Sequence, residues 1–202
     1  MNLLRAIYPE RAVCVACGRP SEGEFLCEEC GETLEELRLE GAREGGSYRY
    51  DGVAKRLVHR LKFDNVTAAA TVLARAMALD VMKMNPSPDT VVTWVTMPDK
   101  RKRIRGIDHG QVLARAVGLR LKLPVRRLLI RSDKHPLRTQ RGATRAERLR
   151  NLTDLFTPEE ELPRDILLVD DVITTGATME TCCACLRRAG AHVLHLSATK
   201  VD

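Results

Sequence analysis

The sequence predicts an α/β fold with a largely parallel sheet, preceded by a small N-terminal metal-binding module. Two observations indicate this class. From residue 48 onward, short aliphatic and β-branched runs alternate with segments of helical periodicity, which is the pattern of parallel-sheet proteins. Two Cys-x-x-Cys pairs precede this region, within the first 30 residues. The length of 202 residues suits one main domain with such an appendage.

The predicted elements follow from this alternation in chain order. We expect strands at residues 48–52, 90–97, 128–131, 165–170 and 192–200, and helices at 53–63, 67–84, 110–121 and 176–189. Residues 41–46 predict a linker, and residues 132–151 predict a mobile loop with a short helix at 144–149. Aromatic residues make up only 3% of the chain, so the core is expected to be aliphatic, and few rings are available to stack on nucleic-acid bases.

The two cysteine pairs predict a zinc site. Cys14 and Cys17 form one pair, and Cys27 and Cys30 form the second after a spacer of nine residues. Four thiolates complete a tetrahedral shell and leave no open position, so we expect the zinc ion to be structural. Two disulfides are the alternative. The surrounding residues are acidic, which favours a docking or stabilising role over nucleic-acid binding.

We place a zinc-ribbon module at residues 1–45 and the main domain at residues 46–202. The two could be separate units or packed together, and the short connection favours packing. The longest stretch without Asp, Glu, Lys or Arg is Ala189–Thr199, 11 residues, whereas a membrane span needs about 20. With no secretory signal recognised at the N-terminus, we expect a cytoplasmic protein without membrane insertion, in which clustered cysteines bind metal rather than form disulfides.

The positive charge is concentrated in one part of the chain. Residues 99–150 contain 17 Lys and Arg against 4 Asp and Glu, a local charge of +13, whereas the other 150 residues carry −7. Such a segment predicts an anionic partner, which could be nucleic acid, membrane headgroups or a polyphosphate metabolite. The alternative is a solvated, Arg-rich surface helix.

Residues Ile166 to Thr178 carry the most informative motif. Four apolar residues predict a buried strand, and Asp170 and Asp171 follow at its carboxyl end, where α/β sheets bind ligands. A loop rich in Thr and Gly then opens a helix, whose N–H groups and dipole suit a phosphate. The carboxylates suit a vicinal diol, or Mg²⁺ held through water. Together these features describe a site for a ribose 5-phosphate. The Walker A and dinucleotide-binding glycine motifs are absent.

This segment resembles the phosphoribosyl pyrophosphate (PRPP) motif of type I phosphoribosyltransferases, and the order of motifs along nearly the whole chain resembles the ComF family. The motifs in chain order are the four cysteines, Leu61-Lys62-Phe63, a strand ending in Pro98, a basic run to Arg105-Gly106, Gln111-x-Leu113-Ala114-Arg115, Thr139-Gln140, residues 145–152, Phe156 and the PRPP motif. The chain departs from the family at Ile107-Asp108-His109, where an aromatic residue, Asn and Gln are usual.

The resemblance implies a type I phosphoribosyltransferase-like parallel sheet flanked by helices. It also implies a PRPP-binding protein that uses Mg²⁺, transfers the phosphoribosyl group to an unspecified acceptor and is linked to competence and DNA uptake. Asp170 and Asp171 would take the ribose hydroxyls. The 5-phosphate would bind to Thr174, Thr175, Gly176, Ala177 and Thr178. The pyrophosphate loop would comprise Pro98, Lys100, Arg101, Lys102, Arg103 and Arg105, and a mobile loop would supply Arg138, Gln140, Arg145 and Arg148. Catalysis would depend on Asp170, Asp171, Arg101 and Arg103.

Two other functions remain open alongside this enzyme hypothesis. In one, the PRPP pocket is retained but the protein is a non-catalytic binder of single-stranded DNA. The basic residues that a small polyanion would not use would then contact the DNA, above all Arg120, Lys122, Arg126 and Arg127. In the other, the cysteine module is an adaptor that docks to a competence helicase or translocase.

Overall fold

The computed structural model describes residues 13–21, 25–98, 103, 106–132 and 155–202. Four strands form a parallel sheet in the order β1 (Gly46–Arg49), β6 (His192–Lys200), β5 (Asp165–Ile173) and β2 (Val91–Trp94). Two short strands, β3 (Leu129–Arg131) and β4 (Phe156–Pro158), pair in antiparallel fashion. The helices are α2 (Glu28–Glu36), α3 (Gly41–Glu44), α4 (Gly52–Phe63), α5 (Ala68–Lys83), α7 (His109–Leu121) and α9 (Ala177–Arg188). The predicted α/β class with a parallel sheet flanked by helices is confirmed.

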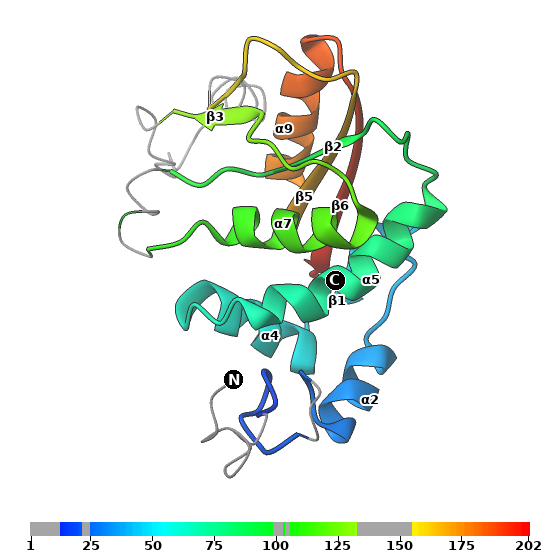
Figure 1. Cartoon of the computed structure of the whole chain (residues 1–202), viewed down its shortest axis with the longest axis vertical. Coiled ribbons are helices and arrows are strands. Elements are labelled where there is room, and N and C mark those ends of the chain that lie inside the picture. Colours follow the sequence, from blue (N-terminus) through cyan, green and yellow to red (C-terminus); the bar gives the residue numbers. More distant parts are fainter. Residues whose placement is uncertain (1–12, 22–24, 99–102, 104–105, 133–154) are drawn as a thin grey trace, which may run out of the picture.

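Helices cover both faces of the sheet, which explains the uninterrupted apolar run of β5. Leu167 and Val169 belong to the core that contains α4, α5 and α7, whereas Ile166 and Leu168 belong to the core that contains α9 and the β3–β4 pair (Figure 1). Successive side chains of a strand point to opposite faces, so a central strand covered on both sides must be apolar at every position. The same run brings the next residues, Asp170 and Asp171, to the carboxyl edge of the sheet.

The N-terminal cysteine module shares a core with the rest of the molecule. Cys14, Cys30 and Leu34 lie in the same buried cluster as Leu57 and Leu61 of α4. Figure 1 shows the module at one end of the molecule, next to α4. The expectation that the module packs onto the main domain is therefore met in the described residues, although the boundary after residue 45 stays a prediction.

A buried ion pair strengthens this junction. Arg38, which follows α2, donates from both guanidinium nitrogens to the carboxylate of Asp80 on α5, at 2.8 and 3.1 Å, and also to the Ser47 carbonyl at 2.6 Å. Asp80 is completely buried. A buried carboxylate is tolerated because this bidentate pairing compensates for the lost hydration.

Several predicted boundaries were wrong. The predicted linker at 41–46 contains the helical turn α3, and the strand predicted at 48–52 lies at Gly46–Arg49. The strand predicted at 165–170 continues to Ile173, so Asp170 and Asp171 lie within β5 rather than after it. The strand predicted at 90–97 is shorter, at Val91–Trp94. The predicted loop at 132–151 lies outside the described residues except for Ser132.

Within the described part of the chain, no helix has both the length and the apolar character that crossing a membrane requires.

Candidate functional site

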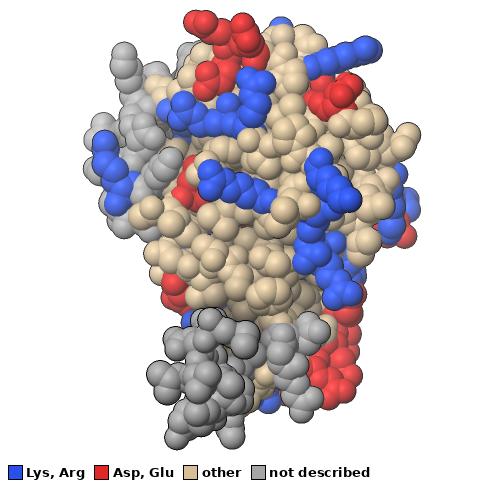
Figure 2. All heavy atoms as spheres, viewed as in Figure 1, with Lys and Arg blue, Asp and Glu red and all other residues tan. Residues whose placement is uncertain are grey.

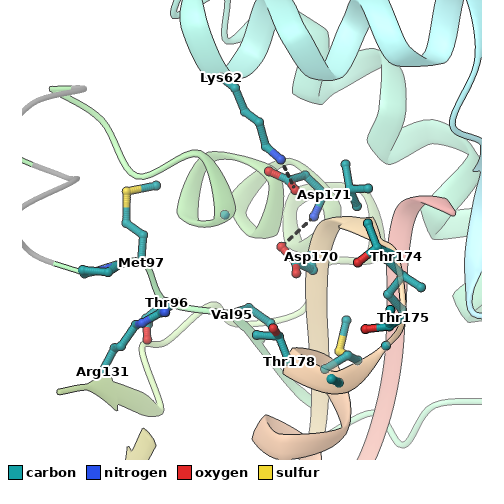
Figure 3. Close-up of a pocket in the computed structure, with 17 residues that line it drawn as sticks. Lys62, Val95, Thr96, Met97, Arg131, Asp170, Asp171, Thr174, Thr175 and Thr178 are labelled. Carbon is teal, nitrogen blue, oxygen red and sulfur yellow. Dashed lines mark hydrogen bonds and ion pairs between the residues drawn. The ribbon is translucent and has the colours of Figure 1, made fainter. Parts of the chain in front are cut away.

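A cleft of about 240 Å³ lies at the carboxyl edge of the sheet. It is lined by the end of β5, the loop from Thr174 to Gly176, the start of α9, the segment 95–98 that follows β2, and single residues from α4, α7 and β3. Figure 3 shows these elements converging on the two carboxylates. The position agrees with the general location of ligand sites in parallel α/β proteins.

The loop between β5 and α9 forms a turn at the cleft. Thr174, Thr175 and Thr178 are exposed at the cleft, and Gly176 caps α9 with a φ of 78°. This left-handed conformation favours glycine, because a Cβ would be strained there. The first N–H groups of a helix have no acceptor within the helix, and the helix dipole adds positive potential. The turn can therefore bind an anion with its backbone and hydroxyl groups.

The two carboxylates experience different environments. Asp171 Oδ1 lies 2.7 Å from Lys62 Nζ, and Asp170 Oδ1 accepts a hydrogen bond of 2.9 Å from the Asp171 amide. Burial, followed by the charge of Asp171, raises the pKa of Asp170 to about 8. The hydrogen bond from the Asp171 amide, followed by the charges of Lys62 and Arg131, acts in the opposite direction on that pKa, with smaller effect. A bound diol or cation would compensate the unfavourable charge on Asp170.

The described lining of the cleft contains ionisable side chains of both kinds. Asp170 and Asp171 are the acidic ones, and Lys62 and Arg131 are the basic ones. Thr96, which is 5% exposed, also lines the cleft, but its hydroxyl is buried and has no hydrogen-bond partner among the described groups. A buried hydroxyl without a partner costs about 1–3 kcal/mol.

The structure brings together only part of the predicted site. Asp170, Asp171, Pro98 and the residues from Thr174 to Thr178 all line the cleft. Arg103 is exposed and does not appear in its lining. The other predicted loop residues lie outside the described part of the chain: Lys100, Arg101, Lys102, Arg105, Arg138, Gln140, Arg145 and Arg148.

Sequence reasoning missed Lys62 and Arg131. In the sequence, Lys62 is part of the Leu61-Lys62-Phe63 motif of the family resemblance, and Arg131 is the last residue of a predicted strand. Neither residue was predicted to belong to the site. Each lies far from Asp170 in the sequence, and both reach the cleft through tertiary packing. One feature of the sequence could have indicated Lys62: it is a basic residue in the last turn of a helix whose other face is apolar.

Asp108, which lies in the segment Ile107-Asp108-His109 where the chain differs from the family pattern, has a structural role. Asp108 caps α7 by accepting from the Gln111 amide at 3.2 Å, and its second oxygen accepts from Trp94 Nε1 at 3.1 Å. A carboxylate supplies an acceptor to each donor, whereas an Asn would offer a single acceptor oxygen. Asp108 therefore fixes the start of α7 against β2, next to the cleft.

The four cysteines form a compact cluster that could hold a zinc ion. The Sγ atoms of Cys14, Cys17, Cys27 and Cys30 all lie within 4.8 Å of one another. A tetrahedral site with Zn–S bonds of about 2.3 Å requires S–S separations of about 3.8 Å, and Cys17 Sγ and Cys27 Sγ are 3.7 Å apart. The residues present therefore fit the expected metal, and all four are free thiols rather than disulfides in the structure.

A neighbouring arginine stabilises one thiolate of this cluster. Arg19 Nε donates to Cys17 Sγ at 3.4 Å, and this hydrogen bond lowers the pKa of Cys17 to about 6. Burial has the opposite effect at Cys30 and raises its pKa to about 12. A bound zinc ion would favour the deprotonated form of all four thiols.

Comparison with known proteins agrees with the motif order. The chain is 31% identical over 143 residues to competence protein F of Haemophilus influenzae, an alignment covering 66% of this chain and 62% of that protein. It is 25% identical over 181 residues to competence protein ComFC of Bacillus subtilis, covering 88% and 72%. It is 29% identical over 205 residues to DNA utilization protein YhgH of Escherichia coli K12, covering 93% and 83%. No family model matches the chain.

The structure is that of an α/β protein with a cleft at the sheet edge and a four-cysteine cluster. Its sequence is related to competence proteins. The chain is a homologue of the proteins named competence protein F, ComFC and YhgH, and the resemblance to the ComF family is confirmed. It spans less than two thirds of the length of competence protein F.

Similar solved structures include phosphoribosyltransferases. An allosteric regulatory enzyme of purine biosynthesis has a TM-score of 0.46 and 21% identity, covering 66% of this chain and 26% of that one. Adenine phosphoribosyltransferase of Leishmania tarentolae has a TM-score of 0.41 and 16% identity, covering 68% and 60%.

Proposed function

We propose that the cleft binds PRPP or a related ribose 5-phosphate together with Mg²⁺, and that the protein transfers the phosphoribosyl group to an acceptor. One observation carries the proposal. Two adjacent carboxylates, Asp170 and Asp171, line the same cleft as the anion-binding turn from Thr174 to Thr178 (Figure 3). A pentose phosphate presents a diol and a phosphate in this way, at opposite ends of one sugar.

Each part of the site has a role in this proposal. The turn from Thr174 to Thr178 binds the 5-phosphate through N–H and hydroxyl groups. Asp170 and Asp171 accept hydrogen bonds from the ribose hydroxyls. Basic residues between Pro98 and Arg105, including Arg101 and Arg103, would neutralise the pyrophosphate, and Arg138, Gln140, Arg145 and Arg148 would supply further contacts to the ligand. The metal, when bound, supplies further neutralisation of the pyrophosphate oxygens.

The chemistry needs positioning and charge compensation more than a strong protein nucleophile. Displacement at C1 of the ribose develops positive charge on the ring while the pyrophosphate departs with its negative charge. Carboxylates on the diol side and basic groups on the pyrophosphate side match this charge separation.

The cellular role proposed here is in DNA uptake or utilization in the cytoplasm. The relatives are named for competence and for DNA utilization. A phosphoribosyltransferase-type activity on a product of imported DNA would fit both names.

Calorimetry tests the ligand assignment. Wild-type protein with Mg²⁺ and PRPP is expected to bind, and the Asp170→Asn/Asp171→Asn double variant is expected to lose affinity at least about 100-fold, because amides replace both carboxyl groups that would accept from the ribose hydroxyls. Thermal unfolding of the same variant checks that it is folded. Unchanged PRPP affinity in a folded double variant would refute the site. A pyrophosphate-release assay with a panel of amines and nucleobases then tests catalysis and identifies the acceptor.

Single-stranded DNA binding is the second candidate. Arg115, Arg120, Lys122, Arg126 and Arg127 are exposed on α7 and the segment after it. Figure 2 shows Lys and Arg side chains in separate groups on this face rather than in one continuous patch. DNA binding through these groups should weaken steeply between low and physiological salt. Affinity that barely changes over this range would exclude the candidate.

A helicase or translocase partner is the alternative role for the cysteine module. Under this alternative, substitution of Cys27 abolishes capture of such a partner and leaves PRPP affinity intact. Loss of both partner capture and PRPP affinity would instead show that the cysteines support the fold on which the cleft depends.

A further inference from the structure

The last turn of α4 contacts both the cysteine module and the cleft. Arg60 Nε donates a hydrogen bond of 3.2 Å to the carbonyl of Val15, which lies between Cys14 and Cys17 in the sequence. Two residues further on, Lys62 Nζ lies 2.7 Å from Asp171 Oδ1. Figure 3 shows Lys62 extending from α4 toward Asp171 across the cleft. One helical turn therefore connects two sites that are otherwise separate.

The Val15 carbonyl is held in place by the fold of the cysteine loop. Its own amide donates to the Phe25 carbonyl at 2.8 Å, and the Cys14 amide donates to the Arg19 carbonyl at 2.7 Å. Val15 is 7% exposed and belongs to the core shared with α4. The acceptor that Arg60 uses is consequently in position only when the cysteine loop is folded.

The helix between the two contacts is well anchored. Val53, Ala54, Leu57, Val58 and Leu61 are all buried along one side of α4. A helix packed over its full length moves as a rigid element, so a shift at Arg60 displaces Lys62 as well. The Lys62 side chain is partly buried, at 24% exposure, and Asp171 is at 11%, where an ion pair is screened by water much less than at the surface.

Lys62 meets a specific requirement of the carboxylate pair. Two adjacent carboxylates repel each other, and Asp170 Oδ1 is already engaged by the Asp171 amide. Lys62 fixes the orientation of the Asp171 carboxylate and compensates its charge. Its contact is to the carboxylate of β5 and not to the phosphate turn, so its effect should be the same for any ligand that uses the carboxylates.

We propose that Lys62 is a positioning residue for Asp171 and that the cysteine module holds Lys62 in place through Arg60 and α4. This inference rests on the proposed function of the cleft. Folding of the cysteine module then sets the affinity of the cleft for a ribose phosphate.

The test uses the zinc-loaded chain of 202 residues, with calorimetry against ribose 5-phosphate and against PRPP, each with Mg²⁺. Lys62→Met should lower affinity for both ligands by a similar factor, at least about tenfold. Lys62→Arg should recover most of this loss, because it keeps the charge and a donor. Lys55→Met is the matched control, since Lys55 lies over the Tyr50 ring on the same helix and away from the cleft lining.

A second set of variants tests the link to the module. Arg60→Met should lower affinity about threefold or more, and the Arg60→Met/Lys62→Met double variant should bind as Lys62→Met does, because Arg60 acts through Lys62. Asp64→Ala removes the 3.1 Å ion pair of Arg60 but leaves the Val15 contact, so its affinity should be unchanged. Thermal unfolding confirms that every variant is folded.

The outcomes separate this inference from the proposed function. If the wild type binds neither ligand, the proposed function fails and the inference fails with it. If the wild type binds, and the Asp170→Asn/Asp171→Asn variant does not, but Lys62→Met binds normally, only the inference is overturned. A loss confined to PRPP would also overturn it, because Lys62 would then serve the pyrophosphate rather than Asp171. Additive effects of Arg60→Met and Lys62→Met would overturn the link to the module.

Discussion

Asp170 and Asp171 are adjacent in the sequence but differ in their surroundings. Asp171 pairs with Lys62, whereas burial and the charge of Asp171 raise the pKa of Asp170 to about 8 from an ordinary value of 3.8. Local sequence predicted both residues as site residues. Their electrostatic difference follows mainly from the burial of Asp170 and from the pairing of Asp171 with Lys62, and the tertiary structure produces both.

The raised pKa of Asp170 predicts a pH-dependent cost in the ligand-free protein. The folded state binds this proton more tightly than the unfolded state, so the contribution of Asp170 to stability is present below about pH 4 and is lost as pH rises through about 8. Asp170→Asn should therefore raise the free energy of unfolding relative to wild type at pH 8.5, on the order of 1–2 kcal/mol, and by less at pH 5.

Urea unfolding of both proteins at the two pH values measures this difference. An Asp170→Asn effect that is equal at pH 5 and pH 8.5 would contradict the prediction. If Asp170 serves binding rather than folding, the Asp170→Asn variant should be more stable than wild type and should bind the ligand more weakly.

At the scale of elements, α3 is the clearest case in which packing overrode a local prediction. The Gly-rich segment at 41–46 predicted a linker, yet Gly41 begins a helical turn packed against α5. A Cβ at Gly41 would collide with the Asp80 carboxylate. Glycine is present because the turn passes directly over the buried Arg38–Asp80 pair, and only the three-dimensional structure identifies that neighbour.

Gly41→Ala should therefore destabilise the protein by about 2–4 kcal/mol, because it displaces a buried, ion-paired carboxylate. Gly31→Ala is the matched control. Gly31 lies inside α2, and a Cβ there would meet no atom within 4 Å, so alanine should be neutral or stabilising by up to about 1 kcal/mol. Chemical denaturation compares the two variants, and equal effects would argue against the packing explanation.

At the scale of the whole molecule, the cysteine module shares one of the two buried cores of the α/β domain. Cys14, Cys30 and Leu34 pack with α4 and α5 residues in a single buried cluster. Loss of a metal from the cysteines should consequently weaken the whole structure and not only its N-terminal end.

Chelation of zinc, or Cys17→Ser, should lower the midpoint of thermal unfolding by roughly 5–10 °C, and unfolding should remain a single transition. Calorimetry measures both quantities. Two separate transitions, with the main one at the wild-type temperature, would show that the module folds independently and would contradict the shared core.

The sequence by itself determined the features that depend on short spacing. Each of these features lies within a short segment, so its chemistry can be predicted from the order of residues. They are the four cysteines, the apolar run of β5, the two carboxylates and the turn from Thr174 to Thr178. The class of fold followed from the alternation of elements, and the motif order identified the ComF resemblance.

The contacts between these segments and distant residues are visible only in the tertiary structure. Lys62 and Arg131 enter the cleft, Asp108 joins α7 to Trp94, and Arg38 is paired with Asp80. Each of these contacts links residues at least 14 positions apart. Such contacts form because the apolar faces of helices are buried on both sides of the sheet, and this packing brings polar residues together at the sheet edge. The order of residues along the chain does not specify that geometry.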